Sequence, residues 1–200
     1  MKRISLFIFL LCASQVHATD EQDGFQTLPF GSSYEKTVEY LRTHIVKPTA
    51  LDFFNRDLKD KKHSIQIIGF HLDDLEVYVN FYLNHNYDFY GFSFNTTRAP
   101  MDSFDSVVYK NGEFLSRVFI NKYGYPQKCS AVRPGEISPG LLTTHCKWDN
   151  TSVYAYTGFT FHDGSYFAEG FVYSLKMYQD EKDYQYSLTK AKADRAKGSF

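Results

Sequence analysis

Histidines and paired acidic residues are the side chains in this sequence that could bind a metal or transfer a proton. His71 and His85 fall at opposite ends of an expected β-hairpin, about 25–30 Å apart at about 3.3 Å per residue, which is too far to share a metal. His145 and His162 are separated in the same way. Asp73-Asp74 resembles a catalytic acid pair, but Asp is a common turn residue, and a turn is expected here.

Motifs that carry enzymatic chemistry are also missing from the sequence. It contains no Gly-x-Ser-x-Gly, no His-Glu-x-x-His and no Gly-rich phosphate loop. We therefore predict no catalytic residues, no metal site and no cofactor. Enzymatic activity stays open, but it is the less favoured class.

The N-terminus predicts export. Lys2 and Arg3 precede an apolar run, Ile4 to Cys12, that is too short to span a bilayer comfortably. Val16-His17-Ala18 then supplies small residues where a signal peptidase cleaves, so residues 1–18 are a predicted signal peptide, cut after Ala18. A periplasmic or secreted protein without a transmembrane segment follows. The alternative is a lipoprotein acylated on Cys12, although Leu11 precedes that cysteine where Gly or Ala is preferred.

Two cysteines remain after the predicted cleavage, Cys129 and Cys146. An even count in an oxidising compartment indicates a disulfide bond between them, which would add about 3 kcal/mol by closing a short loop. A catalytic thiol or a redox pair is the alternative. The sequence holds no Cys-x-x-Cys, however.

Aromatic residues provide the main functional indication, because the chain has 16 tyrosines and 19 phenylalanines. In Leu75 to Leu83, apolar residues alternate with polar residues and tyrosines, which is typical of a β-strand with one buried face. Ser152 to Phe161 shows a similar alternation. The residues on the faces that alternation assigns away from the core are Glu76, Tyr78, Asn80, Tyr82, Tyr154 and Tyr156. Together they predict a protein-binding surface, since tyrosine buries a large area and keeps a polar tip. Alternatively, a helix or the tail covers this face, or the tyrosines are cross-strand pairs that support the sheet.

Two similar groups of elements would position these residues. The predicted organisation is an N-terminal arm at 19–31, a first α-β-β-β unit at 32–100, a second at 101–176, and a helix or tail at 177–200. Ser32 and Glu35 form an expected capping box at the first helix. A central helix from Asp102 begins with a cap at Asp102 or Ser103 and ends at Gly124 and Pro126. The fold class is thus α+β, with two tandem units, antiparallel sheets and helices packed on one face.

The last strand of the second unit, Tyr166 to Leu175, has no clear faces. Phe167, Phe171 and Tyr173 share their parity with Glu169, so alternation does not separate apolar from polar residues there.

Two helix-plus-sheet units in an exported chain, with Tyr123-Gly124-Tyr125-Pro126 ending the central helix, resemble the β-lactamase inhibitor protein fold and BamE-like envelope modules. That resemblance covers most of the stretch from Ser32 to Leu175 in element order, and implies a protein-binding or inhibitory module. The formal net charge of −1 becomes about −3 once Lys2 and Arg3 are removed, so nucleic acid is not an expected partner. A non-enzymatic protein-binding or inhibitory module is therefore our functional hypothesis, with a partner in the envelope or outside the cell. The alternatives are a small ligand-binding protein or hydrolase with a site between the two sheets, and a structural envelope component.

Overall fold

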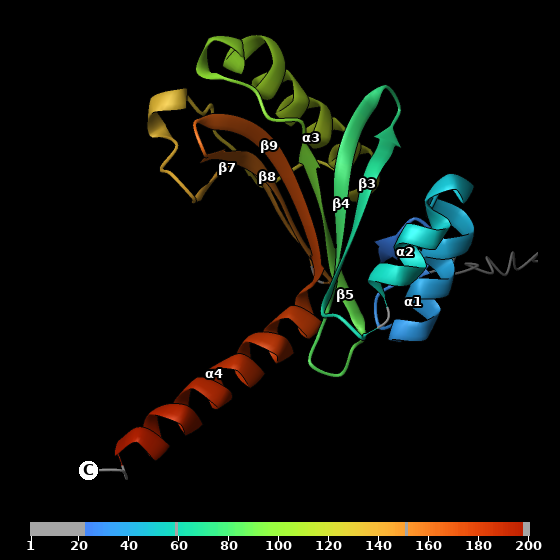
Figure 1. Ribbon diagram of the computed structural model, residues 1–200. Helices are drawn as coiled ribbons and strands as arrows, with labels where there is room; N and C mark the ends of the chain where they lie inside the picture. Colours follow the sequence, from blue (N-terminus) through green and yellow to red (C-terminus); the bar gives the residue numbers. More distant parts are fainter. Residues whose placement is uncertain (1–22, 59, 151, 198–200) are drawn as a thin grey trace, which may run out of the picture.

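The computed structural model describes residues 23–58, 60–150 and 152–197 (Figure 1). Their strands form one seven-stranded antiparallel sheet and a separate two-stranded hairpin. Across the sheet the order is β3 (Ser64–Leu72), β4 (Leu75–Leu83), β5 (Phe89–Thr96), β9 (Ser165–Ser174), β8 (Val153–His162), β7 (Leu142–Asp149) and β6 (Lys128–Cys129). The predicted signal peptide, its cleavage site and Cys12 lie outside the described residues.

The prediction of two tandem units, each with its own sheet, was wrong. The third strands of the two groups, β5 and β9, pair with each other in register from Gly91↔Tyr173 to Asn95↔Glu169. Both strands are buried over most of their length on both sides. Strands that are buried on both faces are disfavoured at a solvent-exposed edge, and their pairing places them at the centre of a single sheet.

Three helical segments pack on the sheet: α1 (Tyr34–Tyr40), which continues as a π-helical turn; α2 (Leu51–Asp57); and α3 (Lys110–Tyr123), which follows a 3₁₀ turn and a π-helical turn over Met101–Tyr109. The apolar face predicted for β4 is confirmed as core, with Val77, Val79, Phe81 and Leu83 all buried. Alternation predicted four core residues on β8; Val153, Ala155 and Phe159 are buried, while Phe161 is partly buried and packs against the core. Alternation therefore placed both second strands correctly.

The ends of the helices agree only in part with the predicted caps. Gly124 ends α3 with a φ of 78°, as expected, and its carbonyl accepts from Trp148 Nε1 at 2.8 Å. Neither Asp102 nor Ser103 caps the start, since a 3₁₀ turn from Met101 precedes the helix. At α1 the cap is Ser33, one residue later than predicted, because Ser32 donates to the carbonyl of Pro29 instead.

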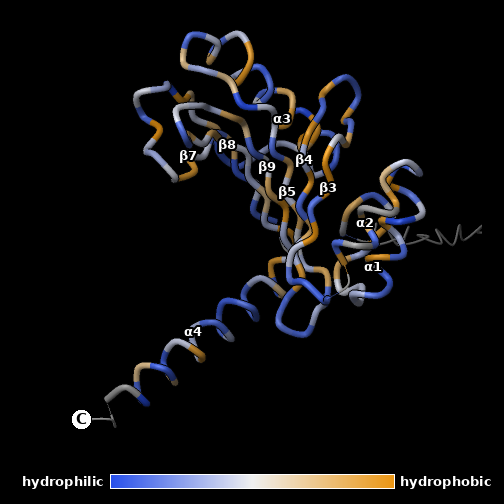
Figure 2. Tube along the Cα trace, viewed as in Figure 1, coloured by the Kyte–Doolittle hydropathy of each residue, from blue (hydrophilic) through white to orange (hydrophobic). Residues whose placement is uncertain are grey.

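Two further segments differ from what the sequence predicted or left open. In place of a loose arm, β1 (Gly24–Phe25) and β2 (Leu28–Pro29) form a hairpin, and its Phe25 ring lies 4.8 Å from that of Phe81 in the core. The C-terminal segment is a helix, α4 (Leu175–Lys197), which leaves the end of β9 and projects from the body (Figure 1). Its surface is mainly hydrophilic (Figure 2).

The predicted disulfide bond between Cys129 and Cys146 is confirmed. The two residues face each other across the β6–β7 pair, with their Cα atoms 4.1 Å apart. The bond joins the short edge strand β6 to β7 and closes the connection between them, which contains a 3₁₀ turn at Pro134–Glu136.

Candidate functional site

The face of the sheet turned away from α3 holds all six predicted binding residues, and we call it the bare face. β5 and β9 lie between β4 and β8, so their outward side chains complete the surface. One line of register partners runs from Tyr82 through Gly91 and Tyr173 to Tyr154. Gly91 leaves room for the Tyr173 ring, because a Cβ there would lie 2.8 Å from Tyr173 Cε1.

Aromatic rings occupy the end of the bare face nearest α4, and we call them the tyrosine cluster. Its members are Tyr82, Tyr90, Tyr154, Tyr156, Phe171, Tyr173 and Tyr178. The rings of Tyr156 and Phe171 lie 4.9 Å apart, and those of Tyr173 and Tyr178 lie 4.9 Å apart. Tyr154 also carries Lys147 Nζ 5.0 Å from its ring centre. Such contacts add to area burial and fix the rings in place.

Burial disfavours ionisation of four phenols of the tyrosine cluster. It raises the pKa of Tyr90 to about 12, and it also raises the pKa of Tyr82, Tyr156 and Tyr173. A neutral, partly buried hydroxyl is a hydrogen-bonding group rather than a nucleophile at neutral pH. The cluster therefore suits non-covalent contact better than catalysis.

A chain of polar side chains crosses the middle of the bare face over five strands. Gln66 Nε2 donates to Asn80 at 3.1 Å, Asn80 Nδ2 to Ser93 at 3.2 Å, and Ser93 Oγ to Asn95 at 3.3 Å. The chain ends on Glu169, whose carboxylate accepts from Asn95 Nδ2 at 2.9 Å and from Thr160 Oγ1 at 2.5 Å. Burial raises the pKa of Glu169, and the Thr160 hydrogen bond only partly opposes that shift.

Beyond the polar chain the bare face contains a cavity of about 450 Å³. Its side chains come from β3, β4, β5, β9 and the turn after β5: Gln66, Tyr78, Asn95, Thr97, Arg98 and Phe167. The guanidinium carbon of Arg98 lies 5.3 Å from the centre of the Phe167 ring. We call this hollow the Arg98 cavity.

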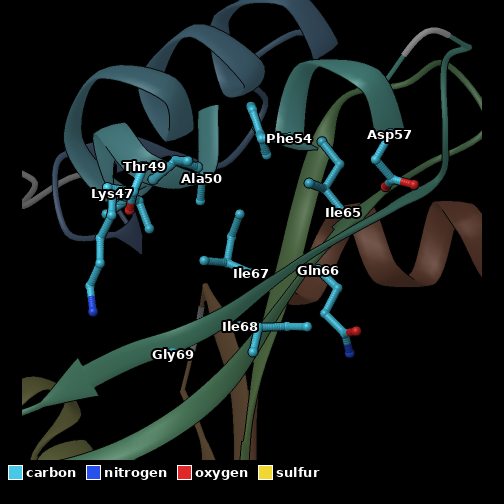
Figure 3. A pocket seen from close by; sticks show the side chains of 12 residues that line it. Lys47, Thr49, Ala50, Phe54, Asp57, Ile65, Gln66, Ile67, Ile68 and Gly69 are labelled. Atoms are coloured by element: carbon cyan, nitrogen blue, oxygen red, sulfur yellow. The ribbon is translucent and has the colours of Figure 1, made fainter. Parts of the chain in front are cut away.

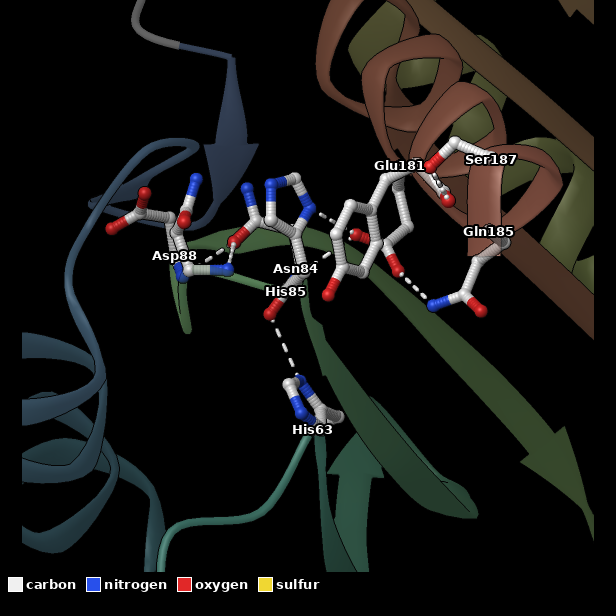
Figure 4. A network of polar contacts seen from close by, with 9 residues as sticks. His63, Asn84, His85, Asp88, Glu181, Gln185 and Ser187 are labelled. Atoms are coloured by element: carbon white, nitrogen blue, oxygen red, sulfur yellow. Dashed lines mark hydrogen bonds and ion pairs between the residues drawn. The ribbon is translucent and has the colours of Figure 1, made fainter. Parts of the chain in front are cut away.

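The first turns of α4 are fixed at the opposite end of the bare face (Figure 4). Glu181 Oε2 accepts from both the backbone N–H and Nδ1 of His85, each at 2.8 Å, and the His85 ring stacks on Tyr184 at 4.0 Å. Burial disfavours ionisation of Glu181, but hydrogen bonds from Gln185 and His85 outweigh it and lower the pKa. This contact and the Tyr173–Tyr178 ring pair hold α4 against the tyrosine cluster, while Tyr78 on the same face of the sheet is 39% exposed.

A second hollow lies elsewhere, between α2 and the edge strand β3 (Figure 3). It measures about 170 Å³ and is lined mainly by apolar side chains, among them Phe54, Ile65 and Ile67. Asp57 at its rim is paired with Lys62 at 2.8 Å. Its polar lining residues are Lys47, Thr49, Asp57 and Gln66.

Comparisons with known proteins, and searches of the described part of the chain for a metal site and a membrane helix, found no match. No family model, curated protein or solved structure matches the chain. Among the described residues, no three His, Cys, Asp or Glu side chains are grouped to hold a metal ion. In the same part of the chain, no helix is both long and apolar enough to cross a membrane. The resemblance to inhibitor and envelope modules stays a prediction.

Sequence reasoning missed the β5 and β9 contributions to the bare face. Ser93, Asn95 and Glu169 were not assigned, and neither was Arg98 in the turn that follows β5. The shared parity of Glu169 with Phe167, Phe171 and Tyr173 was the available signal. All four side chains point to the bare face, which makes Glu169 a buried member of an aromatic surface.

Proposed function

We propose that this chain is a non-enzymatic, exported module that binds or inhibits a partner protein through the bare face. The observation that carries the proposal is the tyrosine cluster, whose rings contact one another across β4, β5, β9 and β8, with Tyr78 39% exposed on the same face. Tyrosine is enriched at the energetic centres of protein interfaces, because it buries area at low entropic cost.

Export is supported by the basic and apolar residues at the start of the sequence and by the Cys129–Cys146 bond. Disulfide bonds persist mainly in the periplasm or outside the cell. We therefore propose a periplasmic or secreted location, and a partner in the same compartment. A lipoprotein acylated at Cys12 remains the alternative form of the mature protein.

The alternative, a small ligand-binding protein or hydrolase with a site between two sheets, is the less favoured function. The described strands form one large sheet and a two-stranded hairpin, so the predicted cleft between sheets is absent among them.

The test compares two double variants in partner capture from periplasmic extract and culture supernatant of the producing organism. Tyr78→Ala with Tyr154→Ala removes two rings of the bare face. Tyr125→Ala with Tyr186→Ala removes two rings that are 88% and 73% exposed elsewhere, and serves as the matched control. We expect the first pair to weaken capture at least about tenfold, or ~1.4 kcal/mol, with the control unchanged.

Both variants must unfold at the wild-type temperature for the comparison to count. Capture of the same partner at wild-type strength by the bare-face variant would contradict the proposal. So would an equal loss in the control, because binding would then depend on tyrosines away from the bare face.

A further inference from the structure

The Arg98 cavity has features that set it apart from the rest of the bare face. The tyrosine cluster is a surface of packed aromatic rings, whereas the cavity is a hollow of about 450 Å³. A water molecule occupies about 30 Å³ in the liquid, so the hollow has room for a whole amino-acid side chain with solvent. Tyr78 lines the cavity and also belongs to the proposed binding surface, so a protein seated on Tyr78 covers this hollow.

The guanidinium of Arg98 lies over an aromatic ring at the cavity. Its carbon is 5.3 Å from the centre of the Phe167 ring, which is only 7% exposed and therefore a fixed platform. A guanidinium over an aromatic face keeps N–H donors that point away from the ring, and these can bind an acceptor. The ion pair with Asp163 is long, at 3.7 Å, and both side chains are more than half exposed, so it holds Arg98 weakly.

The remaining polar groups of the lining are uncharged. No carboxyl group lines the cavity among the described residues. Glu169, the carboxyl nearest in the polar chain, is turned to Asn95 and Thr160. The hydroxyls of Tyr78 and Thr97 have no hydrogen-bond partner within the described part of the chain. One stacked cation with two uncommitted hydroxyls is complementary to an anionic, planar acceptor.

We propose that the Arg98 cavity binds a carboxylate side chain, Asp or Glu, presented by the partner protein. The inference rests on the proposed function, because the partner is what brings the carboxylate to the bare face. Arg98 supplies paired N–H donors in the plane of the carboxylate, and Tyr78 and Thr97 supply further donors from the cavity wall. The cavity thereby selects an acidic residue at one position of the interface, next to aromatic contacts that have little charge preference.

The first experiment tests the chemistry without the partner. N-acetylglutamate N-methylamide is titrated into ¹⁵N-labelled protein, and the Nε–H signal of Arg98 and the backbone amide of Thr97 are followed by NMR. We expect saturable shifts that weaken as salt is added. N-acetylglutamine N-methylamide, the neutral analogue, is expected to give no saturable shift. Arg98→Gln should abolish the response of Thr97 to the charged probe.

Arg117→Gln is the matched control, since Arg117 also stacks on a phenylalanine, Phe114, at 5.8 Å, but on α3. It should leave the response at Arg98 and Thr97 unchanged. Absence of a saturable shift in the wild type would overturn the proposal. Equal shifts with the neutral analogue, or a response that survives in Arg98→Gln, would overturn it as well.

The second experiment identifies the source of the carboxylate. We expect Arg98→Gln to weaken capture of the partner about tenfold, with the Arg117→Gln control at wild-type strength. If Arg98→Gln captures the partner normally while the probe still binds the wild type, the partner is not the source and the inference fails. If only the Tyr78→Ala, Tyr154→Ala variant loses capture, the proposed function is supported and the carboxylate site at Arg98 is contradicted.

Discussion

Glu169 is the residue whose chemistry depends most on its neighbours. It is 8% exposed at the centre of the sheet, on a face that is otherwise aromatic and amide-rich. Two donors, Asn95 and Thr160, satisfy its carboxyl oxygens. Burial nevertheless raises its pKa, so the ionised carboxyl is less favourable in the folded chain than in the unfolded chain.

We predict that Glu169→Gln stabilises the protein relative to wild type as the pH rises. The folded pKa lies above the unfolded value, so wild-type stability is greatest while Glu169 stays protonated. It falls as pH rises from the unfolded pKa toward the folded pKa. The difference in unfolding free energy between variant and wild type should therefore move in favour of Gln as the pH rises above the ordinary pKa of a glutamate, and it should level off once the pH exceeds the raised pKa of the folded state. Chemical denaturation at several pH values measures it.

Glu76→Gln, an exposed carboxyl on the same face, is the control and should show no such trend. A difference for Glu169→Gln that stays constant with pH would refute the assignment of its titration to burial.

Residue patterns in the sequence predicted two strands of the bare face, β4 and β8, and missed the contributions of β3, β5 and β9. Tyr78 and Tyr154 were placed correctly because their apolar neighbours alternate strictly with them. On β9 the rule failed, since Glu169 is buried among aromatic residues and is stabilised there by donors from two neighbouring strands. These donors can be identified only when the strand pairing is known. The alternation within β9 alone therefore could not assign Glu169 to a face.

Helix α3 lies unusually close to the sheet. Gly112 faces Phe159, and a Cβ at Gly112 would lie 2.6 Å from Phe159 Cζ. One turn later Ser116 Oγ meets Thr157 Oγ1 at 2.7 Å, and Phe119 then lies over Gly170. Small residues thus alternate between helix and sheet, and they allow the two layers to interlock.

We predict that Gly112→Ala destabilises the protein by about 1–3 kcal/mol, although alanine favours helix by about 1 kcal/mol over glycine. The added methyl group has to displace Phe159 or the helix. Gly135→Ala is the matched control, because no atom would contact its Cβ within 4 Å, and it should change stability little. Urea unfolding of both variants measures the effect. A neutral or stabilising Gly112→Ala would show that α3 does not pack as described.

At the scale of elements, periodicity predicted the strands and the helix end at Gly124, while the caps were less accurate. The cap at Ser33 instead of Ser32 depends on a hydrogen bond of Ser32 to Pro29, which belongs to the preceding hairpin. The hairpin itself escaped prediction, because strands of two residues carry no measurable alternation. Its Phe25 is held by contacts with rings of β3, β4 and β5 that only tertiary structure supplies.

For the whole molecule, the pairing of β5 with β9 decides the architecture. Both α-β-β-β segments were recognisable from local patterns, but those patterns say nothing of which strands meet across a long separation. If β5 were an edge strand, both the backbone and the side chains of Phe92 and Phe94 would be exposed. Joining the segments removes both edges, and it makes the bare face wide enough to include the polar chain and the Arg98 cavity.

We predict that residues 23–100 and residues 101–197 do not fold when produced separately. Each piece would retain three longer strands. Its β5 or β9, which lies at the centre of the full sheet, would lose its partner and become an edge strand with apolar surface exposed. Circular dichroism and amide NMR dispersion of each piece measure the outcome, and the intact chain is expected to unfold in one cooperative transition. Cooperative melting of either piece alone would contradict the prediction, because it would show that half of the sheet folds without the other half.

The same strand pair also bears on the order of events as the chain folds. Asn95 and Glu169 are 74 residues apart, whereas β3–β4 and β8–β9 are joined by short turns. Closing a longer loop costs more chain entropy, by about 0.6 kcal/mol for each doubling of length, so we expect the local hairpins to form before the central seam. The rate-limiting encounter would then be between two partly formed half-sheets. Until they meet, each half-sheet would present a hydrogen-bonding edge to any other nascent chain nearby.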